Sequence, residues 1–83
     1  MPATVLIVDD REVVRTELRC ALEIFASTAV VGEASDGWEA LCRAEDLRPD
    51  IVLMDLEMPG LDGFEATRRI KARHLARTVI VLT

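Results

Sequence analysis

The stretch IVLMDLEMPGLDG, residues 51–63, joins an apolar run to an acid and then to a turn. The run at 51–54 is continuous and aliphatic, which predicts a short strand buried on both faces. A proline and two glycines after it favour a tight change of direction. Asp55 stands where the two meet. Since an ionised carboxylate is costly to bury without a partner, Asp55 must be paired, hydrated or used for chemistry.

Apolar runs and helical patterns alternate through the rest of the chain. The further elements expected are strands at residues 3–8, 29–34 and 78–83, and helices at residues 12–27 and from 36 and 62 onward. Two pairs of acids match the capping box that marks a helix start. They are Asp36 with Glu39 and Asp62 with Glu65. Apolar strands that alternate with helices indicate a parallel sheet covered on both faces, in one small domain.

On the first helix, apolar residues recur at helical spacing and predict one face turned toward the sheet. They are Val14, Leu18, Ala21, Leu22 and Phe25. The strand at 29–34 is expected to be weaker than the others, because Gly32 interrupts it.

Acids follow two of the predicted strands. Asp9 and Asp10 come directly after residues 3–8, as Asp55 does after 51–54. Parallel strands end at one edge, so in neighbouring strands these carboxylates converge, and without compensation at least one pKa must rise. A hard cation such as Mg²⁺ compensates them, and a carboxylate beside it can accept a phosphoryl group. Asp10 alone would be read as a helix cap, but acids at two matching strand ends favour a site.

The overall charge disfavours nucleic-acid contact by this segment. The formal net charge is −5, and the basic residues gather in 68–77 at helical spacing without interleaved aromatic residues. Cys20 and Cys42 belong to no metal-binding or redox motif. Trp38 and His74 are expected at the surface. The N-terminal apolar run is too short to span a bilayer and follows no basic leader, so we predict a cytoplasmic protein without membrane contact.

Three stretches strongly resemble the receiver domain of two-component response regulators. They are LIVDD at 6–10, VLMDLEMPGLDG at 52–63 and VIVLT at 79–83. The stretches VGEASDGWEAL and DGFEATRRIK are most similar to the LuxR/NarL-like branch, whose members carry DNA-binding effector domains. The resemblance implies an α/β fold of the flavodoxin-like type, a doubly wound parallel sheet with strand order 2-1-3-4.

The same resemblance implies roles for the acids. Asp55 would be the phosphoacceptor, taking its phosphoryl group from a sensor histidine kinase. Asp10 and Asp55 would bind Mg²⁺ directly, and Asp9 would act mainly through water. The backbone carbonyl of Glu57 would complete the protein ligands of the metal.

Three further residues match positions that shape the loop or report phosphorylation. Thr83 matches the switch hydroxyl, which reorients toward the phosphate. Pro59 and Gly63 match the turn after the acceptor, where their role is conformational. The side chain of Glu57 occupies a variable position beside the acceptor.

The chain departs from a complete receiver in its length. Residues 1–83 are expected to be the N-terminal portion of such a domain, truncated after the fourth strand and lacking the fifth strand, the last two helices and a lysine. Lys71 is the only lysine and lies in the third helical pattern, so it does not replace that residue by position. The strand at 78–83 would present an open edge, which predicts a homodimer or strand-swapped self-association.

The favoured function is a phosphorylation-controlled switch that is not a turnover enzyme and that controls a C-terminal effector domain, expected to bind DNA. One alternative is a phosphorylation-independent interaction module or an inactive fragment. Another is a phosphohydrolase of the haloacid-dehalogenase type, which needs an Asp two residues after its nucleophile, where this chain has Glu57. A dinucleotide-binding protein is excluded because no G-x-G-x-x-G follows the first strand.

Overall fold

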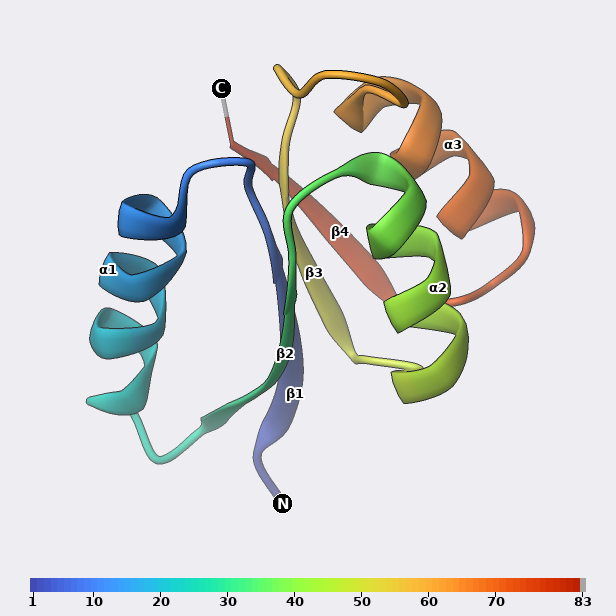
Figure 1. The fold of residues 1–83 in the computed structure, drawn as a ribbon. Helices are drawn as coiled ribbons and strands as arrows, with labels where there is room; N and C mark the ends of the chain where they lie inside the picture. The colour runs from blue at the N-terminus through green and yellow to red at the C-terminus, as the bar shows by residue number, and fades with distance from the viewer. Residues whose placement is uncertain (83) are drawn as a thin grey trace.

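Four parallel strands form the centre of the computed structural model, which describes residues 1–82 (Figure 1). Helices cover both faces of the sheet. The elements are β1 (Ala3–Val8), α1 (Glu12–Glu23), β2 (Thr28–Ala34), α2 (Gly37–Leu47), β3 (Ile51–Asp55), α3 (Gly63–Ala72) and β4 (Thr78–Leu82). The strand order β2-β1-β3-β4 confirms the predicted flavodoxin-like arrangement.

The two central strands, β1 and β3, are adjacent and parallel. Their register pairs Val5 with Ile51 and Val8 with Met54, so both strands end at the same edge of the sheet. Each of residues 5–8 is at most 1% exposed, as expected for a strand flanked by two others and covered on both faces. The residues that follow β1 and β3 are therefore brought together.

The hydrophobic core lies between the sheet and helices α2 and α3. The buried side chains that form it include Leu6, Val8, Val52 and Met54 from the strands, and Ala40, Leu41, Ala44, Ala66 and Ile70 from the helices. Burial of a large aliphatic side chain contributes about 1.5–3 kcal/mol. This layer is therefore the main source of hydrophobic stabilisation.

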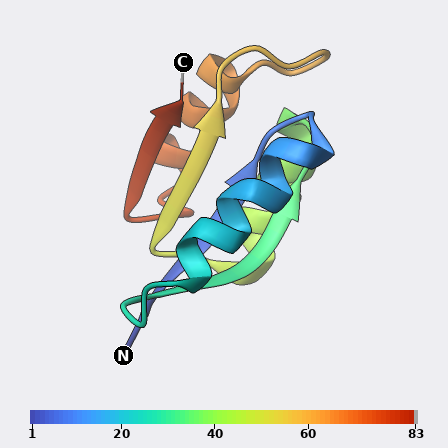
Figure 2. The same ribbon diagram turned by 90° about the vertical axis from the view of Figure 1, so that its left-hand side faces the viewer.

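Helix α1 lies on the opposite face, over β1 and β2 (Figure 2). None of its residues is fully buried. Val14, Leu18 and Leu22 are half-buried, which confirms that they face the sheet, whereas Ala21 is exposed. The prediction for Ala21 is wrong because one helix resting on two strands covers only a narrow stripe.

The first helix also ends earlier than predicted. It stops at Glu23 instead of residue 27, and Phe25 lies exposed in the following turn. The carbonyl of Leu22 accepts hydrogen bonds from Phe25 N at 3.1 Å and from Thr28 Oγ1 at 3.0 Å. These bonds close the helix and start β2, so the apolar position of Phe25 in the helical pattern does not place it in the core.

Strand β2 contains the irregularity expected around its glycine. The pairing with β1 shifts register between Val5 and Leu6. Val5 pairs with Val30 and Leu6 pairs with Gly32, so Val31 has no partner in β1. The strand is nonetheless continuous.

Both predicted capping boxes mark helix starts. The carboxylate of Asp36 accepts from Glu39 N at 2.8 Å, and that of Asp62 accepts from Glu65 N at 2.9 Å. Helix α1 begins differently: its N-cap is Arg11, with no side-chain hydrogen bond to the cap. The alternative role of Asp10 as the cap of this helix is therefore wrong.

The basic stretch 68–77 divides between α3 and the connection to β4. Arg69 pairs with Glu65 at 2.8 Å, and Arg73 pairs with Glu45 at 2.9 Å. His74 is exposed, as predicted. In the part of the chain that the structure describes, no helix has the length and apolar character needed to cross a membrane.

Trp38 and the two cysteines also lie at the surface. Trp38 is 55% exposed, and its ring lies under the guanidinium of Arg69, whose central carbon is 5.0 Å from the ring centroid. Cys20 and Cys42 are free and exposed. The surface position predicted for Trp38 is confirmed.

Candidate functional site

Three carboxylates meet at the C-terminal edge of the sheet. Asp55 is the last residue of β3, while Asp9 and Asp10 follow β1 directly. One carboxylate oxygen of each residue lies within 4.8 Å of the others. The predicted convergence of these three acids is confirmed, and it follows from the parallel register of β1 and β3.

The three carboxylates differ in burial. Asp9 is 1% exposed and Asp55 is 8% exposed, whereas Asp10 is exposed to solvent. Asp55 Oδ1 accepts a hydrogen bond from Glu57 N at 3.2 Å. Within residues 1–82 no protein donor contacts the other oxygen of Asp55, so this oxygen is available to a ligand.

Arg11 neutralises part of the cluster, and the sequence analysis missed it. Asp9 Oδ1 accepts from Arg11 N at 2.9 Å and from Arg11 Nε at 3.1 Å, while Asp9 Oδ2 accepts from Arg11 Nη2 at 3.2 Å. Arg11 Nε also lies 4.0 Å from Asp10 Oδ1. The only available signal was a basic residue directly after the pair of acids.

The electrostatics of Asp9 are set by this contact. Burial pushes the pKa of Asp9 upward, but hydrogen bonds from Arg11 outweigh it and hold the pKa below its ordinary value. The hydrogen bond to Asp9 in turn raises the pKa of Arg11. The sequence analysis expected a cation to compensate the acids, and at Asp9 the guanidinium of Arg11 supplies this compensation.

The backbone of Asp9 is held from the other side. Asp9 N donates to the carbonyl of Ala34 at 3.1 Å, and Arg15 Nη1 donates to the carbonyl of Asp9 at 2.7 Å. Arg15 is itself fixed by Glu33, with Nε 3.0 Å from Oε1. Hydrogen bonds from Arg19 and Arg15, together with their charges, lower the pKa of Glu33 despite its partial burial. This network anchors the acidic loop to β2 and α1.

The loop after Asp55 packs tightly against the start of α3. Gly63 N donates to the carbonyl of Leu56 at 3.1 Å. A Cβ at Gly63 would lie 2.1 Å from the carbonyl oxygen of Asp55, so no side chain fits there. Gly60, which the sequence analysis did not assign, has φ 77°, the left-handed conformation that glycine favours. Together with Pro59 before it, Gly60 forms the Pro-Gly pattern typical of a type II turn.

An opening of about 430 Å³ lies over the acids and is lined by Asp10, Arg11, Asp55 and Glu57. The structure thus places Glu57 beside Asp10 and Asp55. Pro59 is exposed in the turn, away from this lining. Thr83 lies outside the described residues.

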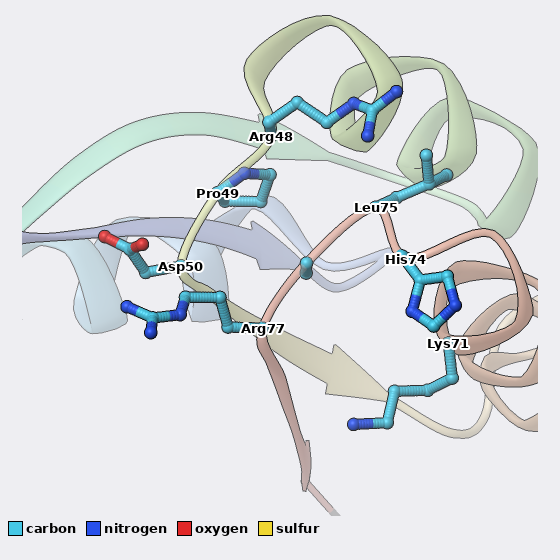
Figure 3. A pocket seen from close by; sticks show the side chains of 8 residues that line it. Arg48, Pro49, Asp50, Lys71, His74, Leu75 and Arg77 are labelled. Carbon is cyan, nitrogen blue, oxygen red and sulfur yellow. The ribbon is translucent and has the colours of Figure 1, made fainter.

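A larger pocket, of about 730 Å³, lies at the opposite edge of the sheet (Figure 3). Its lining includes the basic residues Arg48, Lys71, His74 and Arg77, and the acid Asp50. Asp50 Oδ2 accepts from Thr4 N at 2.9 Å and from Thr4 Oγ1 at 3.2 Å. This carboxylate links the start of β3 to β1, and among residues 1–82 no second acid lines the pocket with it. The smaller opening is therefore the better candidate for chemistry.

The donor set at the smaller opening suits a divalent cation. All three side chains offer carboxylate oxygens, the ligands that hard cations such as Mg²⁺ prefer. The acids at this opening outnumber its one guanidinium, so the opening carries an excess of negative charge that a cation would balance. The group can therefore hold a metal.

Comparison with known protein families gives the class of the protein. The model of the response regulator receiver domain matches residues 5–83. The chain belongs to this family, which confirms the resemblance found in the sequence.

The relatives and solved structures agree with this class. Over 79 residues the chain is 48% identical to the transcriptional regulatory protein LiaR of Bacillus subtilis, covering 95% of this chain and 37% of LiaR. Over 82 residues it is 37% identical to the nitrate/nitrite response regulator protein NarL of Escherichia coli, covering 99% of this chain and 38% of NarL. The structure of the signal receiver domain of a putative response regulator NarL from Mycobacterium tuberculosis matches with a TM-score of 0.89 and 34% identity, covering 96% of this chain and 64% of that one.

Proposed function

We propose that residues 1–83 are the N-terminal portion of a receiver domain that acts as a phosphorylation-controlled switch, with Asp55 as the phosphoacceptor. The observation that carries this proposal is the meeting of Asp9, Asp10 and Asp55 within 4.8 Å at the C-terminal edge of the sheet. Membership of the receiver family agrees with it.

The proposed cofactor is Mg²⁺. Asp10 and Asp55 would bind it directly, Asp9 mainly through water, and the backbone carbonyl of Glu57 would complete the protein ligands. The exposed position of Asp10 and the free oxygen of Asp55 support this assignment. When bound, the ion stabilises the negative charge that develops on the transferred phosphoryl group.

The residues of the chain position the acceptor. The hydrogen bond from Glu57 N holds Oδ1 of Asp55, a residue that lines the opening, and within residues 1–82 no protein donor contacts its second oxygen. In the proposed step this oxygen forms a bond to phosphorus while the bond from phosphorus to the imidazole nitrogen of a kinase phosphohistidine breaks. The departing imidazole nitrogen then takes a proton from solvent. Asp55 becomes an acyl phosphate.

The proposed donor is a sensor histidine kinase, which places the protein in the cytoplasm. The proposed output is an effector domain that binds DNA, because relatives such as LiaR are named transcriptional regulatory proteins. Thr83 is the proposed switch hydroxyl. We assign the domain as a switch that modifies itself once per signal, and not as a turnover enzyme.

Self-association through β4 is also proposed. Within residues 1–82, β4 pairs only with β3, and its Ile80 and Val81 are 45% and 40% exposed. An apolar edge strand of this kind can pair with the same strand of a second copy. Sedimentation analysis over a wide concentration range is expected to show dimers, and a monomer throughout would contradict the proposal.

Phosphorylation of the chain tests the proposed function directly. Incubation with acetyl phosphate and Mg²⁺ is expected to add the mass of one phosphoryl group, and hydroxylamine is expected to remove it because it cleaves acyl phosphates. Asp55→Asn should remain unmodified, whereas the exposed control Asp46→Asn should be modified like the wild type. Modification of Asp55→Asn at the wild-type rate would overturn the assignment of the acceptor.

A further inference from the structure

We propose that Arg11 is a displaceable counter-ion of the acidic cluster. Its guanidinium neutralises Asp9 until a divalent cation enters, and it therefore sets the cation concentration at which the site fills. This inference rests on the proposed function in treating the three carboxylates as the metal site. It assigns to Arg11 a role in regulating metal occupancy.

The geometry shows that Arg11 engages Asp9 completely. Backbone N and Nε both donate to Oδ1, and Nη2 donates to Oδ2, at distances from 2.9 to 3.2 Å. Both oxygens of Asp9 are therefore used by one residue. The same guanidinium approaches Asp10 to 4.0 Å and lines the opening over Asp55. A cation that enters the cluster must meet this positive charge.

The two partners of this ion pair differ in exposure. The side chain of Asp9 is 2% exposed, whereas that of Arg11 is 65% exposed. A buried carboxylate is strongly destabilised when it loses its counter-ion, but an exposed guanidinium is readily hydrated. Breaking the ion pair therefore costs little free energy for the guanidinium of Arg11, which water can hydrate. The carboxylate of Asp9, in contrast, needs another positive charge in its place. A divalent cation supplies that charge.

Arg15 shows what a fixed arginine looks like at the same site. Its side chain is 15% exposed, pairs with Glu33 at 3.0 Å and donates to the backbone carbonyl of Asp9 at 2.7 Å. It contacts no carboxylate of the cluster within the described residues. Arg15 thus holds the backbone of the loop, whereas Arg11 contacts the carboxylate from the solvent side and competes there with the cation.

Two effects of opposite sign follow for Arg11→Gln. Without metal, the variant should have a lower Tm than the wild type, because Asp9 loses its charged partner. With metal, it should bind Mg²⁺ about two- to five-fold more tightly, because the competing charge is gone. A residue with a merely structural role would lower the Tm and weaken Mg²⁺ binding together.

A variant that keeps the charge separates direct contact from a general field. Arg11→Lys retains one positive charge but loses the forked contact with both oxygens of Asp9. Direct competition predicts a Mg²⁺ affinity between those of the wild type and Arg11→Gln. A general electrostatic effect predicts that Arg11→Lys binds like the wild type.

Arg68→Gln is the matched control. The side chain of Arg68 is 69% exposed and, like Arg11, pairs with a carboxylate, through Nε and Glu65 Oε1 at 3.1 Å. The substitution removes the same charge at a similar exposure, on α3 and outside the lining of the opening. Its Mg²⁺ affinity should equal that of the wild type.

The experiment is a calorimetric titration of each variant with MgCl₂ at low ionic strength, with Tm measured in the absence of metal. Tighter binding by Arg11→Gln, with intermediate binding by Arg11→Lys, is the expected result. If the wild type binds Mg²⁺ and Arg11→Gln binds no more tightly, this inference is overturned and the proposed function stands. If no variant binds Mg²⁺, both the inference and the proposed metal site are overturned.

Discussion

The two ends of strand β3 each carry an aspartate, and the two carboxylates have opposite surroundings. Asp50, just before the strand, accepts two hydrogen bonds from Thr4, and its own N donates to Thr4 Oγ1 at 2.9 Å. Asp55, at the other end, has a single protein donor at 3.2 Å among the described residues and two neighbouring acids.

The difference separates an acid that belongs to the fold from an acid that is available to a ligand. Hydrogen bonds from Thr4 lower the pKa of Asp50 and satisfy its charge inside the protein. The surroundings of Asp55 instead concentrate negative charge beneath an opening of about 430 Å³. One aspartate stabilises the contact between strands, while the other keeps an oxygen that no protein donor contacts within residues 1–82.

The largest effect is expected from exchanging each carboxylate for an amide and adding Mg²⁺. At a Mg²⁺ concentration of one hundred times the Kd, the wild type should gain about 2.7 kcal/mol of stability. Asp55→Asn should lose nearly all of this gain, because the proposed direct ligand of the metal is removed, whereas Asp50→Asn should retain it. Thermal unfolding with and without MgCl₂ measures both. If both variants lost the Mg²⁺-dependent stabilisation equally, the distinction between Asp50 and Asp55 would be wrong.

The glycines that follow Asp55, Gly60 and Gly63, provide a second test. Gly63→Ala should destabilise the fold by about 1–3 kcal/mol, because the new Cβ meets the carbonyl oxygen of Asp55. Gly60→Ala should cost about 1 kcal/mol through its left-handed φ alone, since no atom lies within 4 Å of the added Cβ. Urea unfolding measures the costs.

Binding of Mg²⁺ extends this test to the acidic end of β3. Gly63→Ala should weaken Mg²⁺ binding, whereas Gly60→Ala should leave it unchanged. Unchanged Mg²⁺ binding in Gly63→Ala would show that the position of Asp55 does not depend on its contact with α3.

A third substitution addresses the opposite end of the strand. Thr4→Val removes the hydroxyl that bonds Asp50 and should destabilise the fold by about 1–2 kcal/mol without changing the Mg²⁺ Kd. Thr16→Val, at an exposed position of α1, is the control and should be nearly neutral. A change in Mg²⁺ affinity in Thr4→Val would indicate that the two ends of β3 are coupled.

The smallest expected effect concerns acidification. The pKa of Asp50 is lowered in the folded state by its bonds to Thr4, so its stabilisation is present above the ordinary value of 3.8 and is lost as the pH falls through the folded pKa. Thr4→Val keeps the bond from the backbone N, which is the larger cause of the lowered pKa, and removes only the bond from the hydroxyl. It should therefore lose slightly less stability than the wild type between about pH 6 and about pH 3.

Urea unfolding across this pH range, without metal, measures the difference. Asp9 and Glu65 also have lowered pKa values, that of Glu65 at about 2, and their contributions cancel between the two proteins. Identical losses of stability would contradict the role assigned to Thr4.

Sequence patterns predict the acidic end of β3 well and the other end poorly. The convergence of the acids follows from two parallel apolar strands, each ending on an aspartate, and both features are local. The bonding of Asp50 depends on Thr4, a residue 46 positions away, which no local pattern reveals. The position of Asp50 directly after Pro49 gives it the appearance of a simple helix-breaking turn.

The misses within the site have similar causes. The role of Arg11 depends on how far its side chain reaches back to Asp9, and this is a matter of rotamer and loop geometry instead of residue spacing. The Pro-Gly pair at 59–60 is a local pattern that indicates the left-handed conformation of Gly60. The close approach of Gly63 to the carbonyl oxygen of Asp55 is a contact in space that no local pattern shows. The early end of α1 depends on the hydroxyl of Thr28, which bonds the helix from the next strand.

Gly37 and Gly63 are the first residues of helices α2 and α3, and both touch the segment from Asp55 to Leu61. A Cβ at Gly37 would lie 2.2 Å from the carbonyl oxygen of Leu61, just as one at Gly63 would meet Asp55. The loop thus packs against the first residues of both helices. Because both helix starts touch this loop, we expect a shift of its backbone to move α2 and α3 together. A chemical change at Asp55 would then have a path to the outer surface of two helices that does not cross the core.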